Sequence, residues 1–108
     1  MTTQINCKAS FAFEVNQLAD IPDVPLGTEL LCHWGQQKEC HEDNNIRAMW
    51  AAAALKEYVA NTGEDEFEAT ISDLLGDLMH LCDALDVDFD EALRRGRNAY
   101  EPESEGRW

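Results

Sequence analysis

Carboxylates that could bind a cation or a basic protein are concentrated in one stretch of the chain, from Glu64 to Glu91. That stretch holds eleven Asp or Glu residues and no Lys or Arg, and the whole chain carries a formal net charge of −14. Its apolar residues recur with helical spacing, so we expect the carboxylates to decorate folded surface rather than a floppy tail. They must then face solvent, a cation or a basic partner.

Recognition of a basic protein is the chemistry that we predict for this stretch. Carboxylates at helical spacing, followed by an acidic turn, present negative charge at intervals resembling a phosphate backbone and so suit the basic groove of a nucleic-acid-binding protein. If exposed, Trp34 or Trp50 would add an apolar anchor. Alternatively, the acids only keep the protein soluble. The residues expected to contact the partner are Asp73, Asp77, Asp83, Asp86, Asp88, Asp90 and Glu91.

Composition limits the other partners. The acidic balance argues against direct binding to nucleic acid or to an anionic membrane, since phosphate contacts need cations. The chain has 108 residues, 44% hydrophobic and 28% charged, which predicts a single domain at residues 1–100 and a disordered acidic tail at 101–108. No secretory leader begins it and no apolar run is long enough to span a bilayer, so we expect a cytoplasmic protein.

The chain has four cysteines, Cys7, Cys32, Cys40 and Cys82. In the cytoplasm we expect them to be reduced thiols unless they hold a metal. Zinc is an alternative at the two Cys-His pairs, Cys32-His33 and Cys40-His41, but structural zinc sites usually have closely spaced pairs such as Cys-x-x-Cys, and that spacing is absent. We therefore predict no metal site, with Cys7 and Cys32 as small buried hydrophobic residues.

The N-terminal third of the chain predicts strands. From Ile5 to Val15 apolar residues occupy every odd position, the period of a strand with one buried face, and Thr28 to Trp34 alternates similarly. A connection rich in Pro and Gly separates the two segments, which indicates an antiparallel pair. The first strand would also offer an edge for a homodimer.

Three helices are expected after the sheet. The first runs from a cap at 43–45 to about residue 60 and ends before Gly63, the second spans about 65–85, and the third runs from 88 to about 100 behind a capping box. The predicted fold is thus α+β, a short antiparallel two-stranded sheet followed by three helices. On the second helix, one apolar stripe is expected in the core: Phe67, Ile71, Leu74, Leu75, Leu78, Leu81, Cys82 and Leu85. On the third, basic residues near the C-terminal end would complement the helix dipole: Arg94, Arg95 and Arg97.

Part of the acidic stretch resembles a known enzyme family. The run Asp73-Leu74-Leu75-Gly76-Asp77-Leu78, followed by Phe89-Asp90-Glu91-Ala92-Leu93-Arg94, is similar to the second half of the MazG-type all-helical nucleotide pyrophosphohydrolases. The resemblance implies that Asp77 binds a metal ion. The chain departs from the family because Leu74 stands where a Glu is expected and residues 46–60 lack the paired Glu motif. A degenerate enzyme of this type would use Glu66, Asp73 and Asp77 around magnesium.

The span from Trp50 to Tyr100 also resembles small acidic proteins of phages and prophage regions, which implies a mobile element and a bacterial host cell but no activity. Some small acidic phage proteins inhibit CRISPR complexes or restriction enzymes. We therefore predict a non-enzymatic interaction protein without a cofactor, a nucleic-acid mimic that inhibits a basic, nucleic-acid-handling partner. The alternatives are a degenerate magnesium-dependent pyrophosphohydrolase and a structural phage component that acts by homo-oligomerisation.

Overall fold

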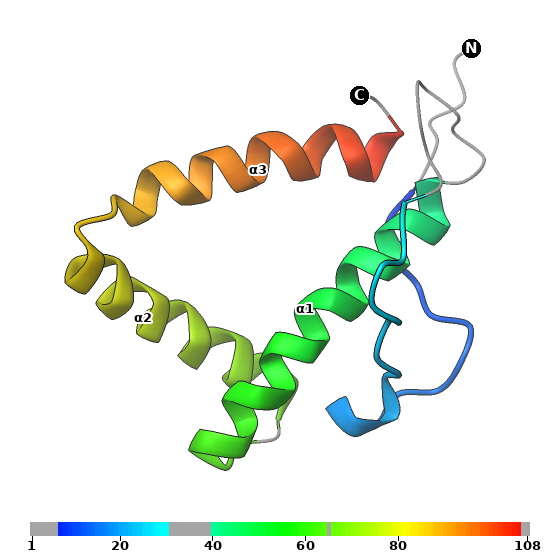
Figure 1. The fold of residues 1–108 in the computed structure, drawn as a ribbon, viewed down its shortest axis with the longest axis horizontal. Coiled ribbons are helices and arrows are strands. Elements are labelled where there is room, and N and C mark those ends of the chain that lie inside the picture. Colours follow the sequence, from blue (N-terminus) through cyan, green and yellow to red (C-terminus); the bar gives the residue numbers. More distant parts are fainter. Residues whose placement is uncertain (1–6, 31–39, 65, 107–108) are drawn as a thin grey trace.

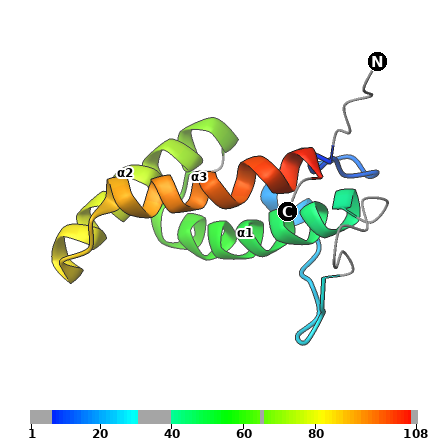
Figure 2. The same ribbon diagram turned by 90° about the horizontal axis from the view of Figure 1, so that it is seen from above.

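The computed structural model describes residues 7–30, 40–64 and 66–106. In those residues the chain forms a 3-10 turn, η1 (Leu18–Asp20), and three helices, α1 (Cys40–Thr62), α2 (Phe67–Leu85) and α3 (Phe89–Glu105). Helices α2 and α3 diverge from a tight turn like the arms of a V, and α1 crosses their open ends (Figure 1). A view from above shows the same helices and no arrow in the coloured part of the chain (Figure 2).

The predicted α+β fold is wrong, because the described residues form no strand. Residues 7–15 are irregular, and their backbone groups bond to side chains of α1 instead of to a second strand. Asn44 Nδ2 donates to the Cys7 carbonyl oxygen at 2.7 Å, the Ser10 N–H donates to Asn45 Oδ1 at 2.7 Å, and Asn45 Nδ2 donates back to the Ser10 carbonyl oxygen at 3.3 Å. These amide side chains satisfy the backbone groups that a paired strand would have satisfied.

Parts of both predicted strands lie outside the described residues. Residues 5 and 6 of the first strand and residues 31–34 of the second are among them, so Cys32, His33 and Trp34 are not placed. The start of the second strand, 28–30, is described and is not part of a sheet.

The three predicted helices are confirmed, but the predicted cap of the first at 43–45 is wrong, because α1 already begins at Cys40. Local signals account for the other ends. Helix α1 stops before Gly63, which adopts φ +80° and donates its N–H to the Val59 carbonyl oxygen at 2.8 Å. The Glu66 side chain caps α2 by accepting the Ala69 N–H at 3.2 Å. As predicted, Asp88 caps α3, whose Glu91 N–H it accepts at 3.1 Å.

Helix α3 is longer than predicted. It continues past residue 100 to Glu105, through the segment for which the sequence predicted a disordered tail, and ends at Gly106 with φ +70°. Its arginines consequently lie in its middle, and its last turn carries no basic residue. The explanation of these arginines by the helix dipole is therefore wrong.

Contacts far apart in the sequence fasten the end of α3 to the start of α1. A disulfide joins Cys7 to Cys40, so the prediction of reduced thiols is wrong for this pair. The Cys7 N–H donates to the Ser104 carbonyl oxygen at 2.9 Å, and Asn44 Nδ2 donates to the Glu103 carbonyl oxygen at 3.0 Å. Through these contacts the N-terminal segment, α1 and α3 meet at one point.

The buried apolar core is small. Among the described residues it consists of Cys7, Ile21, Cys40, Ala52 and Leu55, none of them in α2 or α3. The expectation that the stripe on α2 is core is wrong, because its members are half-buried or exposed. A compact chain of this length would have a radius of gyration of about 13 Å. The observed value is 15.6 Å, so the three helices form an open arrangement that leaves apolar surface uncovered.

Candidate functional site

Carboxylates expected to bind a partner gather where α2 turns into α3. Asp83, Asp86, Asp88 and Asp90 are all exposed there, and we call these four residues the acidic turn. The turn lies at the apex of the V formed by α2 and α3, away from α1 and from the N-terminal segment (Figure 1). A partner therefore has free access to it.

The local electrostatics make the acidic turn strongly negative. Asp86 ends α2 in the left-handed conformation, with φ 58° and ψ 43°, and no basic residue lies in the last turn of that helix. The C-terminal end of a helix already carries partial negative charge, so Asp83 and Asp86 add charge of the same sign. The like charges repel one another and destabilise this end of α2. A cation from a binding partner would relieve that repulsion.

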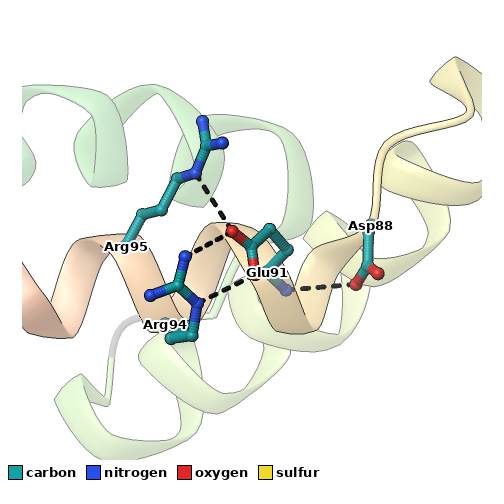
Figure 3. Close-up of polar contacts among 4 residues, drawn as sticks. All are labelled: Asp88, Glu91, Arg94 and Arg95. Carbon is teal, nitrogen blue, oxygen red and sulfur yellow. Dashed lines mark hydrogen bonds and ion pairs between the residues drawn. The ribbon is translucent and has the colours of Figure 1, made fainter.

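At the start of α3 the charge is balanced within the chain. Glu91 accepts hydrogen bonds from Arg94 Nε at 2.9 Å, Arg94 Nη2 at 2.5 Å and Arg95 Nε at 3.2 Å, while Asp88 caps the helix (Figure 3). The bond from Arg94 holds the pKa of Glu91 below its ordinary value and raises the pKa of Arg94. Glu91 is therefore already paired with cations, unlike its neighbours in the acidic turn.

Asp73 and Asp77 are not part of the acidic turn. The Tyr58 hydroxyl, on α1, donates a hydrogen bond to the Asp77 carboxylate, which ties α1 to α2. This bond raises the pKa of Tyr58 to about 12, with smaller contributions from burial and from the charges of Asp77 and Asp73. The structure thus separates the seven predicted contact residues: four form the turn, Glu91 is paired beside them, and Asp73 and Asp77 lie nearer to α1.

Unpaired carboxylates and exposed apolar side chains lie side by side in this region. Within the described part of the chain, the carboxylates of Asp83, Asp86 and Asp90 make no hydrogen bond or ion pair. Leu85 is 63% exposed and Val87 48%. Sequence analysis missed this combination because it assigned Leu85 to the core; the acids on both sides of it were the available signal. Apolar contact combined with charge is typical of a protein-recognition surface.

The alternative magnesium site does not form. Glu66 caps α2, Asp77 binds Tyr58, and these two residues lie about 16 Å apart along the helix axis at its usual rise. No group of three or more His, Cys, Asp or Glu among the described residues is placed to hold a metal ion. For the zinc alternative, Cys40 is in the disulfide, and the His41 ring nitrogen Nδ1 lies 2.9 Å from the Lys8 carbonyl oxygen.

The comparisons with known proteins do not assign the chain to a class. No family model, no curated protein and no solved structure matches it. None of the helices in the described part of the chain is long and apolar enough to cross a bilayer.

Proposed function

We propose that the protein binds a basic, nucleic-acid-handling protein through the acidic turn and blocks the surface on which that partner binds nucleic acid. The observation that supports this proposal is the set of three carboxylates, on Asp83, Asp86 and Asp90, that find no cation among the described residues. They lie on an exposed apex of the molecule (Figure 1). Lysine and arginine side chains of a partner would supply the missing charge.

The two kinds of side chain have different tasks in this proposal. An exposed ion pair contributes only about 0–1 kcal/mol, so the carboxylates alone give little affinity. Burying a leucine or valine side chain contributes about 1.5–3 kcal/mol when the burial is complete. We therefore assign affinity mainly to Leu85 and Val87, and orientation and rate of association to the carboxylates.

Inhibition follows from competition for the same cations. A surface that binds phosphates does so with Lys and Arg, and its affinity for nucleic acid depends on those residues. Carboxylates bound to them would exclude the phosphate backbone. The protein would then act without a cofactor and without touching nucleic acid itself.

We propose the cytoplasm of a bacterial host as the compartment in which this happens. Cytoplasmic thiols are normally kept reduced, so in that compartment the protein must be able to bind its partner with the Cys7–Cys40 disulfide broken. The acidic turn lies at the far end of the molecule from the disulfide (Figure 1), so binding there does not require the bond. We do not propose the magnesium-dependent hydrolase, because Glu66, Asp73 and Asp77 do not form a group that could hold a metal ion.

A pull-down with a matched pair of variants tests the proposal. One triple variant, Asp83→Asn, Asp86→Asn and Asp90→Asn, neutralises the acidic turn. The control triple, Glu14→Gln, Glu29→Gln and Glu57→Gln, makes the same change in net charge at exposed positions elsewhere. Nuclease-treated bacterial lysate is passed over the wild type and both variants at low and high salt, and retained proteins are identified by mass spectrometry.

The expected result is a salt-sensitive nucleic-acid-binding protein that the wild type and the control retain and the acidic-turn variant loses. The purified partner should then bind DNA or RNA less well when the wild-type protein is added. Equal retention by both triple variants would show that the acidic turn is not the contact surface. Retention that does not weaken with salt would show that charge is not the basis of recognition.

A further inference from the structure

Helix α2 carries two parallel rows of side chains, and the chain covers only one of them. Thr70 is buried, and Leu74, Leu78 and Cys82 are half-buried, at successive steps of four residues. The neighbouring row, also at steps of four, is exposed: Phe67 is 38% exposed, Ile71 51%, Leu75 45% and Met79 51%. We call these last four residues the apolar row. It runs for about 18 Å along the helix and forms one of the ridges by which helices pack.

Helix α3 offers a matching groove. Leu93, Gly96 and Tyr100 lie on one face of the helix, and Leu93 and Tyr100 are 45% and 55% exposed. With Arg97 and Glu101 they line a pocket of about 360 Å³. Nothing lies within 4 Å of the position that a Cβ atom on Gly96 would occupy. The glycine thus leaves a notch between two exposed apolar side chains, into which a ridge can pack.

We propose that a second copy of this chain covers these surfaces, with the apolar row of each copy packed against the groove on α3 of the other. Such a contact is symmetric, since each copy contributes both a ridge and a groove, and it closes as a dimer. This inference does not depend on the acidic turn or on the proposed function.

The small core favours a second copy over another protein. Five apolar residues among those described are buried, none of them in α2 or α3, and exposed apolar surface of this kind is typical of a contact site. Only another copy is present at every moment at the chain's own concentration. A dimer would cover part of this surface without any other component.

Charge also favours this occupant. The apolar row contains no charged residue, and Asp73 and Asp77 lie on the opposite side of α2, so the carboxylate beside the row is that of Glu68. Helix α2 has acidic side chains but no Lys or Arg. Arg97, beside the groove on α3, makes no ion pair with a described residue and would face the exposed Glu68 beside the row of the other copy.

The area of the two contact surfaces fits a weak dimer. The apolar row is about 18 Å long and the groove from Leu93 to Tyr100 about 10 Å, so at a width of about 10 Å they present about 280 Å² per copy. The two copies together would bury about 560 Å², which is less than stable specific interfaces bury. We therefore expect a dimer whose population depends on chain concentration.

Sedimentation equilibrium over a range of chain concentrations tests the proposal with two matched pairs of variants. Leu75→Glu places a charge in the apolar row, and Leu26→Glu makes the same change at a fully exposed leucine of a distant turn. Gly96→Leu fills the groove, and Gly76→Leu makes the same change at another open glycine, on α2 but outside the row. Leu75→Glu and Gly96→Leu should each raise the dimer dissociation constant by more than about tenfold, because they bury a charge or fill the notch. The control variants should behave like the wild type.

Thermal unfolding of the wild type tests dimerisation without any variant, so a variant that fails to fold does not affect it. The unfolding midpoint of a dimer rises with chain concentration, whereas that of a monomer does not. A monomeric mass at all concentrations, with a constant midpoint, would overturn the proposal. Unchanged dimerisation of Leu75→Glu or of Gly96→Leu would overturn the assigned contact surfaces.

Salt separates this association from the binding of a basic partner. Because each copy carries a net charge of −14, higher salt screens repulsion between the copies and should strengthen the dimer or leave it unchanged. Binding at the acidic turn should weaken under the same conditions. A dimer that weakens with salt would contradict the apolar contact, and it would leave the proposed function to its own test.

Discussion

Single residues show how the same kind of side chain serves different purposes in this chain. The Asp77 carboxylate accepts a hydrogen bond from Tyr58 and connects two helices, whereas the Asp83 carboxylate has no partner among the described residues. Both were predicted to contact a basic protein, because the sequence alone does not distinguish a paired carboxylate from an unpaired one. At this scale, the neighbours of each carboxylate decide whether it is available to a partner.

The Tyr58–Asp77 bond predicts a measurable titration. The bond raises the pKa of Tyr58 to about 12, above its ordinary value of 10.0. The neutral hydroxyl therefore stabilises the fold fully below about pH 10, and this contribution is lost as the pH rises towards about 12. Absorbance of the tyrosinate, measured in a Tyr100→Phe background, should show Tyr58 ionising near pH 12. In Asp77→Asn the midpoint should fall towards 10, and a midpoint that did not move would show that Asp77 is not the cause.

Asp86 predicts a conflict between stability and binding. Its left-handed conformation costs about 1 kcal/mol for a residue with a side chain, and its charge lies at the unfavourable end of α2. Asp86→Gly should therefore stabilise the protein by up to about 1 kcal/mol, offset in part by the greater freedom of glycine in the unfolded chain. Thermal unfolding measures this change.

The same variant should retain less of the basic partner in the pull-down. Higher stability combined with weaker binding would indicate that Asp86 is kept for recognition. A destabilised Asp86→Gly would show that neither the left-handed conformation nor the charge of Asp86 strains the end of α2. Asp86→Asn is the matched control, because asparagine tolerates the left-handed conformation and removes only the charge.

At the scale of elements, the N-terminal segment shows why an alternating pattern did not become a strand. Its odd positions do not form one buried face: Cys7 is fully buried, but Phe13 is 42% exposed. The rings of Phe11 and Phe13 stack on each other at a centroid distance of 5.0 Å. Side chains of α1 take the backbone bonds of this segment, and the disulfide holds its start against that helix.

The disulfide predicts a large effect of reductant on stability. The linked cysteines are 33 residues apart in sequence, and closing a loop of that size stabilises a folded chain by about 4 kcal/mol. At a fixed chain concentration, dithiothreitol should lower the unfolding midpoint of the wild type. Dithiothreitol should not change the unfolding midpoint of a Cys7→Ser, Cys40→Ser variant.

Thiol counting supplies the control for that measurement. Under denaturing conditions without reductant, the wild type should expose fewer free thiols than its four cysteines, and Cys82 should react because it takes no part in the bond. Four reactive thiols, with a midpoint indifferent to reductant, would contradict the disulfide.

At the scale of the whole molecule, the open arrangement and the charge explain why two different associations are compatible. The acidic turn lies at the apex of the V formed by α2 and α3 (Figure 1). Exposed apolar side chains lie along both helices. A dimer along the arms would leave the apex free for a basic partner. The two contacts differ in their physical basis, so salt should weaken the contact at the apex but not the dimer.

What the sequence by itself determined are features that depend on neighbours within a turn or two. Gly63 ends a helix and Asp88 begins one because the conformations and caps of helix ends are local. The density of carboxylates between Glu64 and Glu91 is likewise legible in the sequence, and it led to the acidic turn.

Only the tertiary structure decided what depends on residues far apart in the sequence. Cys7 meets Cys40, and Asn44 takes the backbone bond that a strand would have made, so a pattern typical of a sheet yields none. The stripe on α2 has the spacing of a core helix, but burial depends on the helices packed against it, and they cover only one of its rows. Periodicity identifies which side chains share a face, whereas the rest of the chain, or a second copy of it, determines whether that face is covered.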